Sequence, residues 1–103
     1  MEYRLDNYTR QPENLTMRLA NNLRARRLER GYSRRTLSEI TNIPVPTIER
    51  FETTGNISLL AFCRLAIEFD CFDELGAVLG TAKYTTAAEL ETINRNRKRK
   101  RGR

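Results

Sequence analysis

The side chains that could carry chemistry in this sequence are mainly arginine and lysine, which bind anions but do not exchange protons at neutral pH. The 103 residues include 19 Lys and Arg and no His. The two cysteines, Cys63 and Cys71, stand in apolar runs without the spacing of a metal site, so we expect ordinary buried thiols that stay reduced. The sequence has no Gly-rich phosphate loop. We therefore expect that the protein is not an enzyme and has no catalytic residue, metal site or cofactor.

The net charge of +6 is distributed unevenly along the chain. Residues 1–17 carry a net charge of −1, residues 18–35 carry +6, residues 36–94 carry −6 and residues 95–103 carry +7. A basic band and a basic tail separated by an acidic body are typical of a nucleic-acid binder whose opposite side avoids nucleic acid. Solubility alone does not require this segregation of charge.

The length of the chain corresponds to one domain, and its apolar content of 39% is enough for a small core. No window approaches the ~18 continuous apolar residues that a membrane span needs. The N-terminus, with Glu2 and Asp6, lacks the charged-then-apolar order of a signal peptide. We expect no membrane association and a cytoplasmic location.

The elements that must position the basic side chains are predicted to be helices, which places the chain in the all-α class. Leu15, Leu19 and Leu23 recur at four-residue spacing in the first helix. Ser33 and Ser58 are suitable N-caps for two later helices. The predicted helices span residues 14–30, 34–42, 45–52, 59–69, 72–79 and 86–93. The helix over 59–69 is apolar on more than one stripe, so it is expected to be central or shared with a partner.

The second and third predicted helices are joined by a short turn. Asn42 stands where a positive φ is needed, and Asn tolerates this conformation better than other residues except Gly. Pro44 and Pro46 fit only a first helical turn, so the third helix must begin at Pro44 or Val45. The inward residues expected for this pair are Leu37, Ile40, Ile43, Ile48 and Phe51. The arrangement matches the helix-turn-helix of DNA-binding proteins.

The two ends of the chain are interpreted separately. The expected divisions are an N-terminal arm over 1–14, a DNA-binding domain over 15–80 and a C-terminal extension over 81–103. Thr86 and Glu89 have the spacing of a capping box, which predicts the short helix over 86–93. Residues 95–103 are too charged to pack and are expected to be disordered when free.

Residues 15–80 also share a set of residue types and spacings with a known family. These residues are Arg27, Gly31, Tyr32, Ser33, Leu37, Ile43, Thr47, Ile48, Glu49, Arg50, Phe51, Glu52, Gly55, Leu65 and Ala66. The segment resembles the Xre/Cro–cI family of bacterial and phage repressors. The resemblance implies a five-helix λ-repressor-like helix-turn-helix domain and a sequence-specific repressor of transcription.

The resemblance also implies roles for individual side chains. The family positions that face DNA match Arg34, Val45, Pro46 and Arg50. The positions matching Arg27 and Glu52 commonly form an internal ion pair, although Arg27 could instead contact a phosphate. Val45 and Pro46 depart from the family pattern, because they replace polar residues that read base edges. Neither can donate a side-chain hydrogen bond, but Val45 can touch a thymine methyl group.

The full set of expected DNA contacts follows from these positions. Base contacts are expected from Val45, Pro46, Glu49 and Arg50. Phosphate contacts are expected from Arg34, Arg35, Thr47, Thr53, Thr54 and Asn56. The basic tail consists of Arg95, Arg97, Lys98, Arg99, Lys100, Arg101 and Arg103, and is expected to contact DNA beside the operator or, alternatively, a protein partner. Arg50 could instead be an ordinary solvated charge.

The expected function is a homodimeric repressor that binds double-stranded DNA at a palindromic operator, since one short helix reads too few base pairs. The dimer interface is expected at Phe72, Leu75, Val78 and Leu79, together with part of the helix over 59–69. An alternative comes from the small size and basic ending, which are similar to antitoxin repressors encoded with HipA-like kinase toxins. Such an antitoxin binds a toxin from the same operon and regulates its own transcription.

Overall fold

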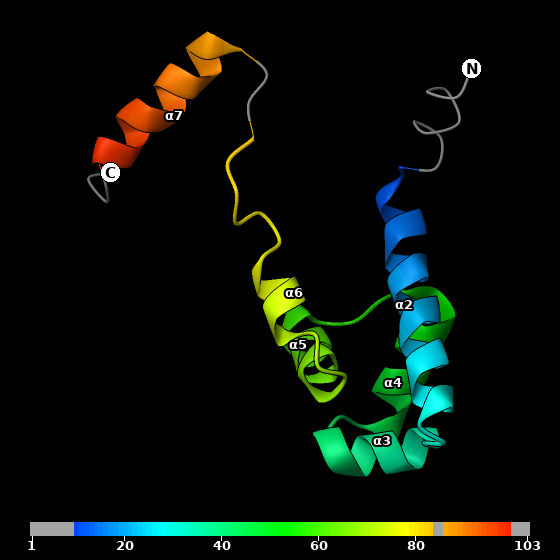
Figure 1. Ribbon diagram of the computed structural model, residues 1–103. Coiled ribbons are helices and arrows are strands. Elements are labelled where there is room, and N and C mark those ends of the chain that lie inside the picture. The colour runs from blue at the N-terminus through cyan, green and yellow to red at the C-terminus, as the bar shows by residue number, and fades with distance from the viewer. Residues whose placement is uncertain (1–9, 84–85, 100–103) are drawn as a thin grey trace. The chain divides into compact units, whose positions relative to one another are not determined.

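The computed structural model describes residues 10–83 and 86–99 (Figure 1). Within these residues every regular element is an α-helix, which confirms the all-α class for the described part of the chain. The helices are α2 (Pro12–Glu29), α3 (Arg34–Thr41), α4 (Val45–Thr54), α5 (Leu59–Glu68), α6 (Phe72–Gly76) and α7 (Ala87–Arg99). The chain divides into two compact units, Met1–Phe72 and Asp73–Arg103. No helix in the described ranges has the length and apolar character needed to cross a membrane.

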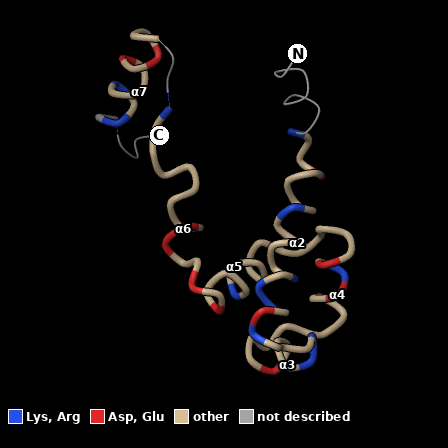
Figure 2. The backbone as a smooth tube through the Cα atoms, turned by 45° about the vertical axis from the view of Figure 1, so that its right-hand side comes forward, with Lys and Arg blue, Asp and Glu red and all other residues tan. Residues whose placement is uncertain are grey.

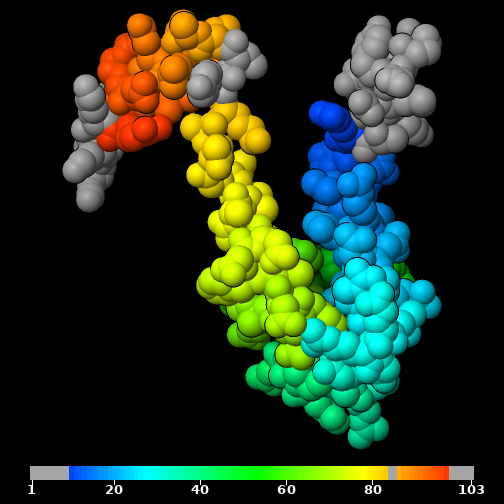
Figure 3. Space-filling model, viewed as in Figure 1, coloured from blue at the N-terminus to red at the C-terminus, as the bar shows by residue number. Residues whose placement is uncertain are grey.

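Helix α2 begins earlier than predicted, because Pro12 occupies its first turn, where the missing N–H of proline has no cost. Its core residues are Ala20 and Leu23, whereas Leu15 is 54% exposed and is not the inward residue that its spacing predicted. The reason is length: α2 has 18 residues, while α3 and α4 have 8 and 10, so these two helices cannot cover all of α2. Figure 3 shows its first turns, in dark blue, uncovered on the face in view. The predicted arm over 1–14 lies largely outside the described residues.

The connection between α3 and α4 has the predicted local geometry. The Ser33 hydroxyl accepts a hydrogen bond from the backbone N–H of Thr36 at 3.0 Å and caps α3. Asn42 adopts φ 61° and donates its N–H to the carbonyl of Ser38, which ends the helix. Helix α4 begins at Val45 with proline in its first turn. The two prolines therefore fix where α4 starts.

The core of the first unit lies where α4 packs between α2 and α3. Its buried apolar residues are Ala20, Leu23, Leu37, Ile43, Ile48, Phe51 and Leu65. Ile40 was expected to point inward but is 45% exposed. Helix α3 contacts its neighbours along the side that carries Leu37, and the next inward position one turn later is the half-buried Thr41. Ile43, in the turn, is buried as expected.

Gly55 ends α4 and brings it against α2. Its φ of +80° is a conformation that other residues adopt only with strain, and a Cβ there would lie 2.9 Å from the hydroxyl oxygen of Thr16. Helix α4 runs to Thr54, two residues beyond the predicted end, because the N–H of Gly55 still donates to the carbonyl of Phe51 at 2.8 Å. Only glycine satisfies both the backbone conformation and the close approach.

Helix α5 starts at the predicted cap, since the Ser58 hydroxyl accepts from the N–H of Ala61 at 3.1 Å. Its inner side buries Leu65 and places the Phe62 ring edge-on to Phe51, with centroids 5.7 Å apart. Both cysteines are free thiols, and both are partly buried rather than fully buried as expected.

The second unit differs from prediction in two places. Helix α6 stops at Gly76 rather than near residue 79, because Gly disfavours a helix interior and Leu79 adopts φ 64°. Helix α7 begins after the predicted cap, where the Thr86 hydroxyl accepts from the N–H of Glu89. It then continues to Arg99, so the expected disorder was wrong for residues 95–99. Arginine and lysine are good helix formers, and their charges are favourable at a helix C-terminus. Residues 100–103 lie outside the description.

Candidate nucleic-acid interface

The candidate interface is anchored by an ion pair inside the first unit. Arg27 of α2 donates from Nε and Nη2 to the two carboxylate oxygens of Glu52 on α4, at 2.7 and 2.9 Å. Both residues are buried, at 6% and 5% exposure. Arg27 also donates from Nη1 to the carbonyl of Tyr32 at 2.9 Å. This bidentate pair is the one that the family resemblance implies, and it fixes α4 against α2.

A third side chain joins this pair from α3. Arg34 donates from Nε to Oε1 of Glu52 at 3.0 Å, and its Nη1 lies 3.9 Å from Oε2 of Glu49. Glu52 therefore connects three helices through one carboxylate. The Arg34 side chain is still 32% exposed, so it holds α3 to α4 while part of its guanidinium faces solvent.

The pKa of Glu52 reflects a competition between burial and hydrogen bonding. Burial of the carboxyl raises its pKa, while hydrogen bonds from Arg27 and Arg34 and the charges of these two arginines lower it. The net result is a pKa below the ordinary value of 4.5. Glu52 is therefore ionised at neutral pH, and its charge is matched by two guanidinium groups rather than left unpaired in the core.

The outer face of α4 carries the side chains available for recognition. Pro46, Glu49, Arg50 and Thr53 are exposed, and their spacing places them on one side of the helix. Ile48, Phe51 and Glu52 occupy the opposite, buried side. Val45, at the start of the helix, is half-buried. Three of the four expected base contacts thus share the exposed face, and Val45 lies at its edge.

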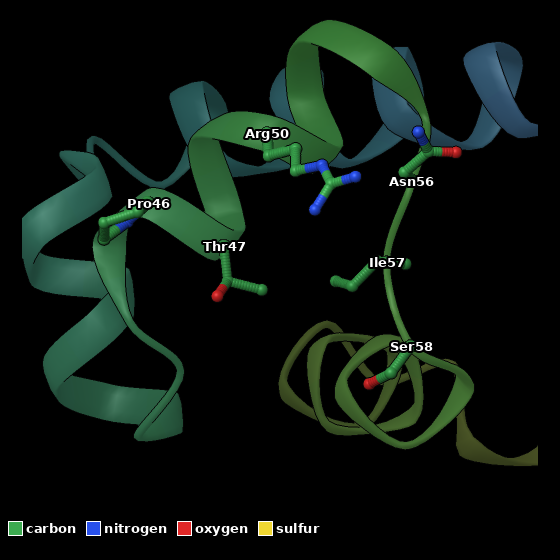
Figure 4. Close-up of a pocket in the computed structure, with 6 residues that line it drawn as sticks. All are labelled: Pro46, Thr47, Arg50, Asn56, Ile57 and Ser58. Atoms are coloured by element: carbon green, nitrogen blue, oxygen red, sulfur yellow. The ribbon is translucent and has the colours of Figure 1, made fainter.

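An open groove of about 580 Å³ runs beside this face. It lies between α4 and the segment that leads into α5, and its lining residues are Pro46, Thr47, Arg50, Asn56, Ile57 and Ser58 (Figure 4). The guanidinium of Arg50 extends across the groove from α4 toward the opposite segment. No carboxylate lines the groove, while Thr47, Arg50 and Asn56 offer N–H and O–H donors. The groove can therefore accept hydrogen-bonding oxygens of an anion.

Three other residues expected to contact phosphate, Arg35, Thr53 and Thr54, already have hydrogen-bond or ion-pair partners within the protein. The hydroxyl groups of Thr53 and Thr54 donate to carbonyl oxygens within α4, at 2.9 and 2.7 Å. Thr54 also accepts from the N–H of Asn56 at 3.1 Å and so shapes the segment after α4. Arg35 is 85% exposed, with its Nε 3.6 Å from a carboxylate oxygen of Glu39. Of the six expected phosphate contacts, Thr47 and Asn56 lie in the groove with Arg50.

The sequence interpretation missed two groove residues, Ile57 and Ser58. Ser58 was identified only as a helix cap, and nothing in the local pattern indicates that the chain after Gly55 turns back beside α4. The shared carboxylate of Glu52 was also missed, because Arg34 was assigned only to a phosphate.

The residues predicted for the dimer interface belong to α6 and the segment that follows it, not to α4. Phe72, Val78 and Leu79 are 68%, 62% and 96% exposed, and Leu75 is half-buried.

Along α7 the charges are separated by sign: Glu89 and Glu91 precede Arg95 and Arg97, as the red and blue segments of Figure 2 show.

Comparison with protein-family models, with curated proteins and with solved structures gives no match to this chain. Any functional assignment must therefore come from the arrangement of its own side chains.

Proposed function

We propose that the protein is a sequence-specific DNA-binding repressor that acts as a homodimer on a palindromic operator in the cytoplasm. In this proposal α3 and α4 form the helix-turn-helix of a five-helix domain of the Xre/Cro–cI type, and α4 enters the major groove. The observation that carries the proposal is the exposed face of α4 beside a groove of hydrogen-bond donors, held rigid by the Glu52 ion network.

Rigidity matters because base recognition depends on geometry. A side chain distinguishes bases only when its donors and acceptors meet the base edge in a fixed orientation. Helix α4 is fixed to α2 through Arg27 and to α3 through Arg34, so its outer residues keep a constant position on the domain.

The proposed readout assigns a different contact to each outer residue. Arg50 donates to a guanine through its guanidinium, and Glu49 accepts from the amino group of a cytosine. Val45 and Pro46 provide apolar contact with thymine methyl groups. Because these last two residues cannot hydrogen-bond through their side chains, we expect preference for thymine opposite the start of α4.

Phosphate contacts hold this helix in register. In the proposal, a DNA phosphate lies at the groove, where Thr47 and Asn56 donate to its oxygens, and Arg34 and Arg35 approach a neighbouring phosphate from the start of α3. Two arginines at a helix N-terminus oppose the helix dipole, and an approaching phosphate relieves this penalty.

Selection of bound sequences from a random DNA pool tests the proposal. We expect a palindrome whose half-sites are centred about one helical turn apart and contain guanine at a fixed position. Recovery of only unrelated sequences, with binding that depends on salt alone, would contradict it.

A further inference from the structure

Helix α5 carries an apolar stripe that the described residues of the first unit leave exposed. Leu59, Leu60 and Ile67 are 73%, 66% and 53% exposed, and Cys63 between them is partly exposed. Leu59 and Leu60 are adjacent and lie four and three residues before Cys63, and Ile67 lies four residues after it, so the four positions follow one side of the helix. Residues of α5, coloured green to yellow-green, form part of the outer surface of the first unit in Figure 3. The stripe is distinct from the core side of α5, where Leu65 and Ala66 are buried.

We propose that this stripe is where a second copy of the chain docks, with Cys63 of the two copies side by side near the twofold axis. The inference rests on the homodimer of the proposed function but not on DNA binding. The expected interface combined residues 72–79 with part of the helix over 59–69, and the proposal identifies that part as the outer face of α5.

Within the stripe, Leu59, Cys63 and Ile67 form a self-complementary set. Leu59 and Ile67 lie four residues before and four residues after Cys63, so a twofold axis at Cys63 places Leu59 against the partner's Ile67. An isologous interface requires this kind of pattern, because each copy presents the same surface to the other.

The charges at the two ends of α5 favour an antiparallel pair. At its C-terminal end, Arg30 is shared between Glu68 and Asp70, with both guanidinium-to-carboxylate distances at 3.3 Å. One guanidinium therefore serves two carboxylates, and Asp70 remains 88% exposed. The N-terminal end carries the positive end of the helix dipole. An antiparallel pair places the acidic end of one copy at the positive end of the other, whereas a parallel pair would bring like ends together.

The size of the stripe sets the expected strength of the dimer. Stable interfaces bury roughly 800 Å² per partner, more than three aliphatic side chains provide. Phe72, which belongs to the same unit and is 68% exposed, adds apolar area. We expect a dimer that exchanges with monomer and whose population depends on protein concentration.

Cys63 offers a direct test in the full chain without DNA. Cys71→Ser leaves Cys63 as the only thiol, and diamide then oxidises two facing thiols to a disulfide. Paired helices lie about 8–10 Å apart axis to axis, which brings facing positions within reach of that bond. We expect a disulfide-linked dimer from Cys71→Ser and much less from Cys63→Ser, which retains only Cys71.

Sedimentation of surface variants provides the second measurement. Leu60→Glu should raise the dimer dissociation constant about tenfold or more, because it places a carboxylate in the stripe. Leu15→Glu is the matched control, since Leu15 is a half-exposed leucine on α2, and it should leave the constant unchanged. Thermal unfolding monitored by circular dichroism checks that both variants fold.

Three results would overturn the proposal. The first is a wild-type protein that stays monomeric over the accessible concentration range. The second is a dimer that is unaffected by Leu60→Glu but lost on Leu75→Asp, which would place the interface at residues 72–79 alone. The third is a monomer whose Cys63 reacts slowly with a thiol reagent until the chain is truncated after residue 80, which would show that the chain's own second unit covers the stripe.

Discussion

The first unit and helix α7 hold their charges in different ways. In the first unit, Arg27 and Arg34 are fixed by a buried carboxylate that connects three helices. In α7, the side chains of Arg95 and Arg97 are exposed, and none of the helix's residues from 87 to 97 is buried. The network fixes α4, the helix that carries Arg50 and Glu49 on its outer face, whereas the exposed arginines of α7 attract any polyanion nearby. In the proposed repressor, selectivity for sequence therefore belongs to the first unit, and general affinity for DNA belongs to α7 and the residues after it.

The largest expected effect comes from removing the carboxylate that fixes the first unit. Glu52→Ala should reduce the free energy of unfolding by about 3–5 kcal/mol, because it leaves Arg27 buried with only the Tyr32 carbonyl as partner. The urea midpoint measures this loss. Glu49→Ala is the control, since Glu49 is exposed and its distance to Arg34 is 3.9 Å. Equal urea midpoints for Glu52→Ala and Glu49→Ala would show that the buried carboxylate of Glu52 stabilises the fold no more than an exposed carboxylate does.

The same carboxylate gives a dependence on pH with a defined sign. The pKa of Glu52 in the folded chain lies below its ordinary value of 4.5, so the folded state holds the proton less tightly than the unfolded state. Its contribution to stability is complete above the unfolded pKa and is lost as the pH falls below about 4.5 toward the folded pKa. Glu52→Gln should flatten this part of the stability profile measured by urea unfolding. If the loss of stability below about pH 4.5 were the same in Glu52→Gln as in the wild type, other carboxyl groups would be its cause.

Removal of the basic end tests the other side of the comparison. Truncation after Asn94 removes seven basic residues and no acid. It should weaken binding to specific and random DNA by similar factors, roughly 10- to 100-fold, and lower the slope of log affinity against log salt. Titrations at several salt concentrations measure both. A truncated protein with full DNA affinity that has lost a protein partner would instead favour the antitoxin alternative.

A smaller and more selective effect is expected from Arg50→Ala. The specific operator should lose about 1–3 kcal/mol of binding free energy, and the preference at one base pair should relax, while random DNA should be bound nearly as before. Arg64→Ala is the charge-matched control, because Arg64 is exposed on α5 away from the groove residues. If Arg50→Ala weakened binding to the specific operator and to random DNA by the same factor, Arg50 would contact only the DNA backbone.

Arg34→Ala should have the smallest effect on DNA binding and a separate effect on stability. Affinity for all sequences should fall together, and the salt slope should decrease by roughly one unit. Because Arg34 also donates to Glu52, the urea midpoint should fall as well, and Arg34→Lys should restore the salt slope better than the midpoint. A variant with an unchanged midpoint would show that Arg27 alone is sufficient to hold Glu52.

Local signals in the sequence predicted the helices well and their ends less well. The caps at Ser33, Ser58 and Thr86 were found because each bonds to a backbone group three residues away. The extension of α7 to Arg99 was missed because charge was taken as a sign of disorder, although basic residues suit the end of a helix. The exposure of Ile40 was missed because periodicity identifies a helix face but not how much of that face a neighbour covers.

The residue types of the chain were sufficient to predict the all-α class of its described part and the turn between α3 and α4, since both depend on contacts within a few residues. Asn42, Pro44 and Gly55 constrain the backbone wherever the rest of the chain lies. The shared carboxylate, the groove and the open stripe of α5 depend on how the helices pack. Glu52 meets Arg27 and Arg34 across 25 and 18 positions of sequence. Such contacts follow from the angles at which helices cross, which side-chain packing in the folded core decides and no local pattern encodes.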